Sequence, residues 1–337
     1  MNRTSLRGFG PLASRTGAIA SSGSPLRRVA VPAIAALALT LSACGGQTAA
    51  DEGDGVSGEV AVNGSSTVFP MSNAAAELLA EENPQIQVTV GEVGTGGGFE
   101  KFCVGETDIN DASRPIKEDE EAPVCAENDV EYTELHIATD ALTVVVHPEL
   151  AVDCLTTDQL IELWKPGSTI TNWNQLDPSF PDQEISLFGP GPDSGTYDYL
   201  AADVIGDESE TTRDDYEASE DDNVLVQGVA GTPGATGYFG FTYYEENQDS
   251  LKALAIDDGN GCVEPSAETA QAGEYTPLSR PLFMYVSNAS YNDNEAVATY
   301  VDFYIENLET IATGAQFIPL NEDEYAETQA ALEGIAS

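Results

Sequence analysis

Positive charge is scarce in this sequence. Its 337 residues include 12 Lys and Arg against 58 Asp and Glu, which gives a formal net charge of −46 at pH 7. Five of the 12 basic residues precede residue 44, where there are no acids, so the rest of the chain carries seven basic residues and a net charge of −51. A field of this sign repels nucleic-acid phosphates and anionic lipid headgroups. Nucleic-acid binding and adsorption to membranes through a basic patch are therefore excluded.

Histidine is also scarce. His136 and His147 are the two histidines of the chain, and it has no C-x-x-C motif. Structural zinc sites use Cys and His at short spacings, and a Ser nucleophile needs a His or similar base beside it. Both histidines stand in apolar, strand-like stretches, where a hydrogen-bonded structural role is expected. We therefore expect no metal, no other cofactor and no enzymatic activity.

An apolar run near the start is too short to span a membrane. Residues 1–28 contain no acids, and the next thirteen are almost wholly apolar, against about 20 residues for a membrane span. The segment L-S-A-C that ends at Cys44 resembles a bacterial lipobox, in which the cysteine takes the lipid. The sequence thus predicts a lipoprotein signal peptide over 1–43, a lipid anchor on Cys44 at the extracytoplasmic face of the cell membrane, and a flexible tether over 44–58. The arginine pair before the apolar run leaves both general and twin-arginine export open.

Four further cysteines favour disulfides. In an exported chain an even number of cysteines favours bridges over free thiols, and four cysteines allow three connectivities. The economical pairing joins Cys103 to Cys125. It then joins Cys154 to Cys262, so that each of two lobes holds one bridge. In the loop-entropy model the two bridges contribute about 3 and about 4.7 kcal/mol.

A strand, a loop rich in Gly, Ser and Thr, and a helix recur along the chain. Strands that alternate with helices predict an α/β fold with mostly parallel sheets, and the loops after the carboxyl ends of the strands are where such sheets bind ligands. The length exceeds that of one compact domain, so two lobes are expected. The first unit has a strand over 59–62, a loop over 64–67 and a helix over 74–80. The second has a strand over 86–90, a loop over 94–98 and a helix from Phe99. The third has a strand over 185–188, a loop over 189–196 and a helix over 197–205.

Later segments complete the predicted organisation. The apolar run 138–147 predicts a strand that crosses between the lobes. The runs 237–244 and 281–286 predict buried strands, and the spacing over 296–311 predicts a helix that closes the chain. The predicted lobes are 59–141 plus 279–337 for lobe one and 142–278 for lobe two.

The loops of these units carry groups that suit an anion. Free N–H groups at a helix start point outward with the positive end of the helix dipole, and glycine lets an oxyanion approach the backbone. Hydroxyls can donate further hydrogen bonds, and Arg114 can supply a bidentate charge-assisted pair. Taken singly, such Ser and Thr residues are also ordinary helix caps. The candidate hydroxyls are those of Ser66, Thr67, Thr95, Ser113, Ser194 and Thr196.

The combination of loops resembles a known family, the PstS-type phosphate-binding proteins of ABC importers. The resemblance covers essentially the whole chain from Glu59 and implies a two-lobed, type II periplasmic-binding-protein fold, hinged so that two α/β lobes close over one phosphate. It implies that Ser66, Thr67, Thr95 and Ser113 bind phosphate from lobe one. From lobe two it implies Ser194, Gly195 and Thr196. The segments that carry it are GSSTVFP (64–70), GTGGGFEKFC (94–103), DINDASRPI (108–116), ITNWNQL (170–176), GPGPDSGTYDYL (189–200) and SEDDNVLVQGV (219–229).

Two positions depart from the pattern of the best-known members. Those members have an Arg four residues before the Ser of the S-G-T loop, where this chain has Pro190, and an Asp where it has Arg114. We infer that the positive charge has moved to the other lobe. The Asp that accepts the phosphate hydroxyl in those members has no clear equivalent, and Asp111 or Asp193 could serve. Such an acceptor admits phosphate, which keeps a proton at neutral pH, and rejects sulfate. Arg213 is a further candidate for the cleft, although an ion pair with a neighbouring Asp is at least as plausible.

These observations predict a monomeric, lipid-anchored receptor that captures inorganic phosphate outside the membrane and passes it to an ABC permease and ATPase complex. The closest alternative is a receptor for another oxyanion such as sulfate or molybdate. A surface phosphoester hydrolase is a third reading, because Ser194 stands in a Gly-rich turn, but residues 191–195 read G-P-D-S-G and not G-x-S-x-G. A sensor or adhesin that kept the fold is a further one.

Overall fold

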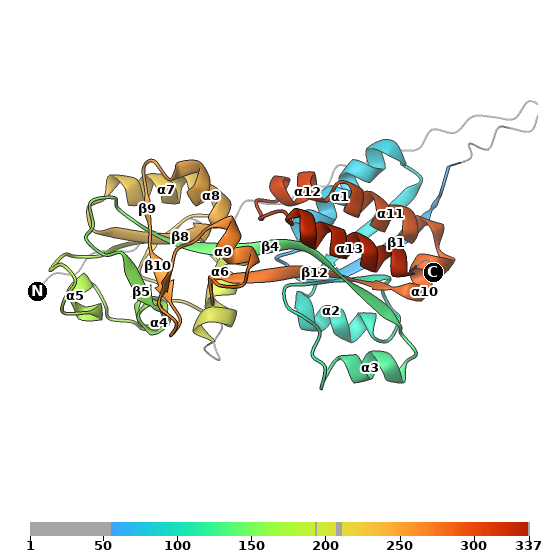
Figure 1. Cartoon of the computed structure of the whole chain (residues 1–337), viewed down its shortest axis with the longest axis horizontal. Helices are drawn as coiled ribbons and strands as arrows, with labels where there is room; N and C mark the ends of the chain where they lie inside the picture. Colours follow the sequence, from blue (N-terminus) through green and yellow to red (C-terminus); the bar gives the residue numbers. More distant parts are fainter. Residues whose placement is uncertain (1–54, 193, 207–210, 336–337) are drawn as a thin grey trace, which may run out of the picture. The chain divides into compact units, whose positions relative to one another are not determined.

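The computed structural model describes residues 55–192, 194–206 and 211–335 (Figure 1). The chain divides into two units, Met1–Glu52 and Gly53–Ser337. The predicted signal peptide, Cys44 and most of the predicted tether lie outside the described residues. Within the described ranges, no helix combines the length and the apolar character needed to cross a membrane.

The strands of the second unit form two sheets. The larger has the order β2-β1-β3-β12-β4-β8-β6-β7, with β9 also paired to β4, and the smaller has the order β11-β10-β5. The strands are β1 (Gly58–Gly64), β2 (Ile86–Glu92), β3 (Ile109–Ala112), β4 (Tyr132–Val146), β5 (Cys154–Thr156), β6 (Ser186–Gly189), β7 (Glu217–Ala218), β8 (Ala235–Gly240), β9 (Lys252–Ala253), β10 (Ala255–Asp257), β11 (Cys262–Val263) and β12 (Ser279–Ser287).

The prediction of mostly parallel sheets is only partly correct. The pairs β1–β2, β1–β3, β6–β7 and β6–β8 are parallel, as strands joined through helices should be. The pairs that include β4 or β12 are antiparallel. The two long strands run in opposite directions between the parallel groups, and this long-range pairing gives no local signal in the sequence.

Helices flank the sheets (Figure 1). In α1, Pro70 stands in the first turn, where its missing N–H costs no hydrogen bond, and the buried residues Met71, Ala75 and Leu79 recur at intervals of four. The helices are α1 (Phe69–Glu82), α2 (Gly94–Phe102), α3 (Ala122–Glu127), α4 (Thr157–Trp164), α5 (Trp173–Leu176), α6 (Gly195–Asp198), η1 (a π-helix, Tyr199–Ile205), α7 (Asp222–Gly231), α8 (Phe241–Asn247), α9 (Ala267–Gln271), α10 (Asn288–Asp293), α11 (Glu295–Glu306), α12 (Leu308–Gly314) and α13 (Glu322–Ile335).

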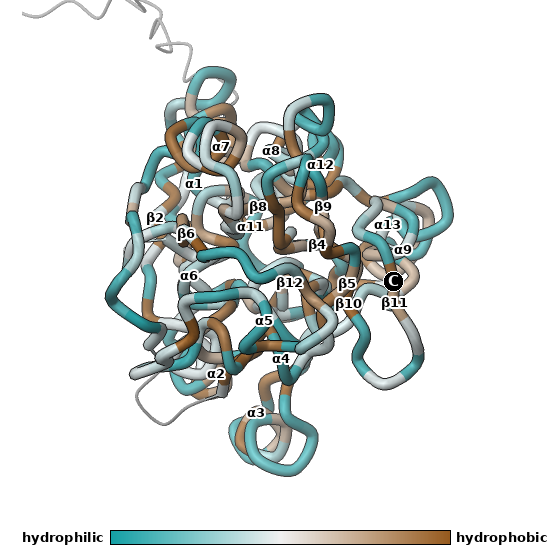
Figure 2. Tube along the Cα trace, turned by 90° about the vertical axis from the view of Figure 1, so that its left-hand side faces the viewer, coloured by the Kyte–Doolittle hydropathy of each residue, from teal (hydrophilic) through white to brown (hydrophobic). Residues whose placement is uncertain are grey.

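Two large hydrophobic cores and three smaller clusters hold most of the buried hydrophobic side chains of the described residues. Core A takes its buried side chains from residues 60–138 and 282–335. Core B takes its buried side chains from residues 142–278, with Trp164 and Trp173 among the largest. In Figure 2 the hydrophobic stretches of the trace gather around β4 and β8, while hydrophilic stretches lie in outer loops. The long strand β4 contributes to both cores.

Three element predictions need correction. The predicted strand over 237–244 ends at Gly240 and α8 begins at Phe241, because a short apolar run does not distinguish a strand from a helix by its periodicity. The predicted helix over 296–311 is two helices, α11 and α12, and the further helix α13 follows them. The second helix, expected from Phe99, already begins at Gly94, so the glycines read as a loop form its first turns.

The two predicted disulfides are confirmed. Cys103 is bonded to Cys125 and Cys154 to Cys262, with separations of 22 and 108 residues. The first bridge joins the end of α2 to α3. The second joins β5 to β11.

Candidate anion-binding site

The loop between β1 and α1 is shaped by a close approach of two backbones. Gly64 has φ +139°, and a Cβ there would lie 2.1 Å from the carbonyl oxygen of Asp111, so a larger residue would not fit. Ser65 and Thr67 are buried, and the Thr67 N–H donates to Ser65 Oγ at 3.2 Å. The hydroxyl-bearing loop is therefore fixed against β3.

The loops after β2 and β3 are joined through their hydroxyls. Thr95 Oγ1 lies 3.1 Å from Ser113 Oγ and also accepts a hydrogen bond from the Ser113 N–H at 3.1 Å. Thr95 is in the first turn of α2, directly after Gly94, whose φ of +76° favours glycine. Two hydroxyls and a helix start thus come together.

The S-G-T loop meets the first loop from the other side. Ser194 caps α6 and accepts from the Thr196 N–H at 3.2 Å. A Cβ on Gly195 would lie 3.5 Å from Thr67 Oγ1. This segment follows β6 and belongs to the part of the chain that builds core B, so the two groups of loops come into contact at Thr67.

Two cavities lie at this contact, and both include Ser66 and Thr67. Five predicted residues line the larger one, and Gly195 and Thr196 line the smaller one; Ser194 is in neither lining and serves as a helix cap. The larger cavity has a volume of about 590 Å³ and is lined by Ser65, Ser66, Thr67, Gly94, Thr95, Gly96, Ser113, Arg114, Asp198, Tyr199, Ala202, Asp203, Pro277, Ser279 and Arg280. The smaller has a volume of about 240 Å³ and is lined by Ser66, Thr67, Pro70, Asp140, Gly195, Thr196, Asp222, Gly240, Tyr243, Ala315, Gln316 and Phe317.

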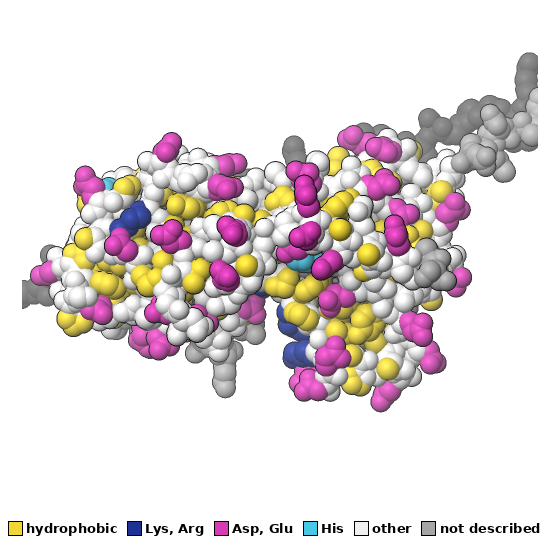
Figure 3. Space-filling model, in the orientation of Figure 1, with side chains coloured by type: hydrophobic (Ala, Val, Ile, Leu, Met, Phe, Trp, Pro, Cys, Tyr) yellow, Lys and Arg dark blue, Asp and Glu magenta, His cyan; other side chains and the backbone are white. Residues whose placement is uncertain are grey.

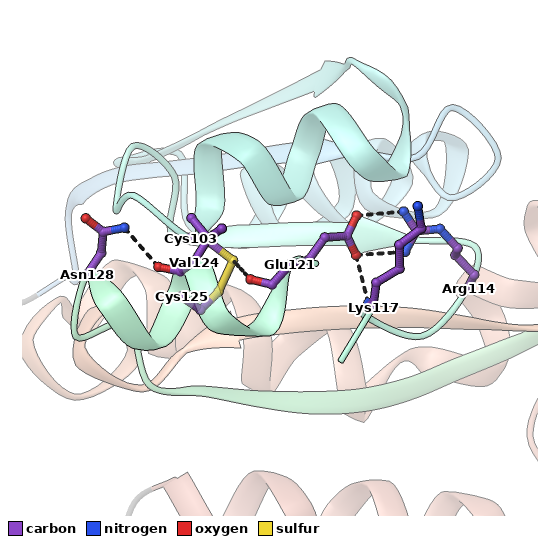
Figure 4. Close-up of a disulfide and its surroundings, with 7 residues drawn as sticks. All are labelled: Cys103, Arg114, Lys117, Glu121, Val124, Cys125 and Asn128. Atoms are coloured by element: carbon purple, nitrogen blue, oxygen red, sulfur yellow. Dashed lines mark hydrogen bonds and ion pairs between the residues drawn. A yellow bond between two sulfur atoms is a disulfide. The ribbon is translucent and has the colours of Figure 1, made fainter. Parts of the chain in front are cut away.

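Arg114 reaches the larger cavity already paired with a carboxylate (Figure 4). Its Nη1 donates to Glu121 Oε2 at 2.8 Å and its Nη2 to Glu121 Oε1 at 2.7 Å, a bidentate pair. Burial alone would raise the pKa of Glu121, but hydrogen bonds from Arg114 and from the Lys117 N–H outweigh it and hold that pKa below its usual value. The same pair raises the pKa of Arg114. Much of the positive charge of Arg114 is therefore neutralised by Glu121, seven residues further along the chain.

Arg280 is a second arginine in the larger cavity, which the sequence analysis missed. It stands on β12 opposite Asp140 of β4, and its Nε donates to Asp140 Oδ2 at 3.1 Å. Its Nη2 donates to Thr67 Oγ1 at 2.9 Å, and its Nη1 donates to Asp203 of η1. The guanidinium carbon lies 3.8 Å from the centre of the Tyr199 ring, a cation–π contact. The rarity of arginine could have pointed to it, because the chain has three arginines after residue 44: Arg114, Arg213 and Arg280.

The candidate proton acceptors fall in different places. Asp111 is buried and is not among the residues that line either cavity, and burial raises its pKa to about 7. Asp193 lies outside the described residues. Asp140, which was not considered as an acceptor, lines the smaller cavity, and burial raises its pKa although Arg280 acts in the opposite sense.

Arg213 has a structural role away from the cavities. Its side chain is 2 % exposed, and its Nε and Nη2 donate to the two carboxylate oxygens of Asp215 at 2.6 and 2.8 Å. Its Nη1 donates to the carbonyl oxygens of Leu163 and Ile170. It lines neither cavity, and the ion-pair alternative is therefore the one that the structure displays.

Comparisons with known proteins agree with this architecture. Residues 49–307 match the family model described as a PBP superfamily domain. Protein SphX of Synechocystis sp. is 45 % identical over 306 residues, 90 % of this chain and 88 % of the relative. The phosphate-binding protein PstS of Staphylococcus saprophyticus is 39 % identical over 299 residues, covering 88 % and 91 %.

A solved structure extends the match to three dimensions. The crystal structure of a possible phosphate binding protein from Planctomyces limnophilus superposes with a TM-score of 0.80 at 40 % identity, covering 84 % of this chain and all of the other. The chain therefore belongs to the PBP superfamily and, within it, to the family that includes SphX and PstS.

Proposed function

We propose that this chain is an extracytoplasmic receptor, not an enzyme, that binds inorganic phosphate and delivers it to an ABC importer. The observation that carries the proposal is the 590 Å³ cavity, in which hydroxyls of Thr67, Thr95 and Ser113 converge with two arginines. The names of the PstS relative and of the Planctomyces limnophilus protein support phosphate as the ligand. A lipid anchor on Cys44 and a monomeric state complete the proposal.

The overall negative charge does not oppose anion binding at this place. Acidic side chains are spread over the visible face in Figure 3, with few basic ones. At physiological salt, charges more than about 8 Å apart are largely screened, whereas hydroxyls, backbone N–H groups and guanidinium groups act at contact distance. Local donors therefore decide the affinity.

Asp140 is our candidate for discrimination between phosphate and sulfate. Phosphate retains a proton near neutral pH and can donate it to a carboxylate, while sulfate has none and would meet an unmatched acceptor. Asp140 is buried beside Thr67 and Gly195 in the lining of the smaller cavity, which shares two residues with the larger one. Asp111 lines neither cavity, so it could accept the phosphate proton only if β3 rearranged.

The two cores suggest how binding leads to a signal. We propose that core A, with residues 59–141 and 279–337, and core B, with residues 142–278, are two lobes that a ligand draws together. The larger cavity is lined by Thr67 from the first group and by Tyr199 and Asp203 from the second, so a ligand in it would contact both groups. The closed form is then the one that the importer recognises.

The hydrolase alternative has no histidine in the described linings of the two cavities beside Ser194. Ser194 Oγ accepts a hydrogen bond from the Thr196 N–H. His136 Nε2 lies 3.0 Å from the Ala138 carbonyl oxygen, and His147 Nδ1 accepts from the Glu149 N–H. Neither histidine lines either of the two cavities described above, so the parts of the chain that the structure describes give Ser194 no histidine there.

Isothermal titration of the purified full-length chain in detergent tests the proposal, with phosphate, sulfate and molybdate in separate runs. We expect one phosphate per chain and no sulfate binding. Thr95→Ala should weaken phosphate binding, whereas Thr299→Ala, a matched change on the outer side of α11, should not. Binding of sulfate or molybdate in place of phosphate would support the oxyanion alternative, and no binding of any oxyanion would refute the proposal.

A further inference from the structure

Arg280 contacts two carboxylates that differ in how firmly they are held. Asp140 is its cross-strand partner, and the exposed fractions of the Arg280 and Asp140 side chains are 11 % and 10 %. Asp203 approaches from η1, 77 residues away along the chain, and its side chain is 53 % exposed. Asp203 and Arg280 both line the larger cavity. Asp203 is therefore the partner that can be exchanged.

The position of Arg280 does not depend on Asp203. The Asp140 carboxylate, the Thr67 hydroxyl and the Tyr199 ring each contact the guanidinium independently. A carboxylate that is half exposed regains water when it leaves its partner, so an ion pair of this kind is weak and exchangeable. An oxyanion can replace Asp203 while the guanidinium stays in place.

We propose that Asp203 acts as an internal competitor of the ligand, occupying Arg280 in the empty cavity until an incoming oxyanion displaces it. This proposal rests on the proposed function, because it takes the oxyanion to be phosphate. Two anions would share one guanidinium, and their mutual repulsion makes simultaneous contact unfavourable. The competition lowers the affinity for phosphate, and the return of Asp203 assists release to the importer.

The competition predicts a variant that binds better than the natural protein. In titrations of the full-length chain with inorganic phosphate, Asp203→Asn should lower Kd roughly two- to fivefold, the range expected for a partly exposed ion pair. Asp153→Asn is the matched control, because it removes the same charge from an exposed pair with Lys252 that lines neither cavity. The control should leave Kd unchanged.

A double-mutant cycle separates competition for Arg280 from a general effect of charge. If Asp203 acts through Arg280, adding Asp203→Asn to an Arg280→Gln chain should give no gain, with thermal melting used to confirm that both chains are folded. A gain that persists in the Arg280→Gln background, or an Asp203→Asn chain that binds phosphate no better or less well, would overturn the proposal. Wild-type protein that binds no phosphate would instead overturn the proposed function itself.

Discussion

The two arginines of the large cavity differ in how their charge is used. Arg114 is held by Glu121 in a bidentate pair within one stretch of the chain, and its side chain is 34 % exposed. Arg280 is 11 % exposed and distributes its donors among a hydroxyl and two carboxylates, one of them exchangeable. The arginine that is obvious in the sequence therefore has both Nη groups held by one carboxylate of its own loop region, whereas the arginine of strand β12 keeps one donor on a half-exposed carboxylate that an anion can replace.

Arg280→Gln should produce the largest loss of phosphate affinity. It removes a mostly buried charge whose donors converge with Thr67 on the cavity. Hydrogen bonds that involve a charged group contribute about 1.5–3 kcal/mol, so we expect Kd to rise roughly 10- to 150-fold. Titration calorimetry measures it, with thermal melting as the check on folding. A loss smaller than that of Arg114→Gln would reverse the comparison.

Arg114→Gln should have a smaller effect. Both Nη groups of Arg114 are already engaged by Glu121 and its side chain is 34 % exposed, so we expect a loss of about 1 kcal/mol, roughly fivefold in Kd. The same titration measures this loss.

The matched control is the double variant Arg114→Gln/Glu121→Gln, which removes both charges of the pair. If compensation explains the small effect, the double variant should bind phosphate at least as well as Arg114→Gln alone, because Arg114→Gln leaves the Glu121 carboxylate uncompensated near the cavity. Weaker binding by the double variant would show that Glu121 contributes in another way.

The carboxylates beside the two arginines should give opposite pH dependences of stability. The pKa of Glu121 is held below its usual value, so its contribution is present above the pKa of the unfolded chain and is lost as pH falls through the lower, folded value. Burial raises the pKa of Asp140, so its contribution is present at low pH and is lost as pH rises through the folded value.

Urea unfolding from pH 3.5 to 7 tests these signs. Glu121→Gln should destabilise the protein at pH 7 by about 1 kcal/mol or less, as expected for a partly exposed pair, and the difference should shrink as pH falls. Asp140→Asn should gain stability relative to wild type as pH rises, because wild type loses the Asp140 contribution over that range. If the stability of both variants relative to wild type changed in the same direction with pH, the opposite pKa shifts of Glu121 and Asp140 would be contradicted.

Local patterns predicted the loops that line the larger cavity. The S-S-T, T-G-G-G and S-G-T segments each follow a strand and open a helix, and five of the eight predicted residues line the larger cavity because strand, loop and helix are neighbours in sequence. The pairing of Cys103 with Cys125, 22 residues apart, is local in the same sense, whereas that of Cys154 with Cys262 followed from the expectation of one bridge in each lobe. The loops and the first bridge have their physical cause within a few tens of residues.

Arg280 could not be found in this way. Its place beside Thr67 depends on the pairing of β12 with β4, which joins residues 140 positions apart, and on the approach of η1. The segment S-R-P-L has no turn or cap signal that marks it as part of a site. Likewise, the aromatic run after Gly237 satisfies both strand and helix patterns, and only packing against the adjacent elements decides between them.

The strand β4 also has a consequence for how the protein unfolds. Its first part places Leu135 and Ile137 in core A, and its second part places Leu142 and Val144 in core B. Unfolding of either core would release β4, whose side chains also pack in the other core, so the two cores should lose their structure together. Calorimetry should then record one cooperative heat-absorption peak although the chain has two large hydrophobic cores, and two separate peaks would mean that the shared strand does not couple them.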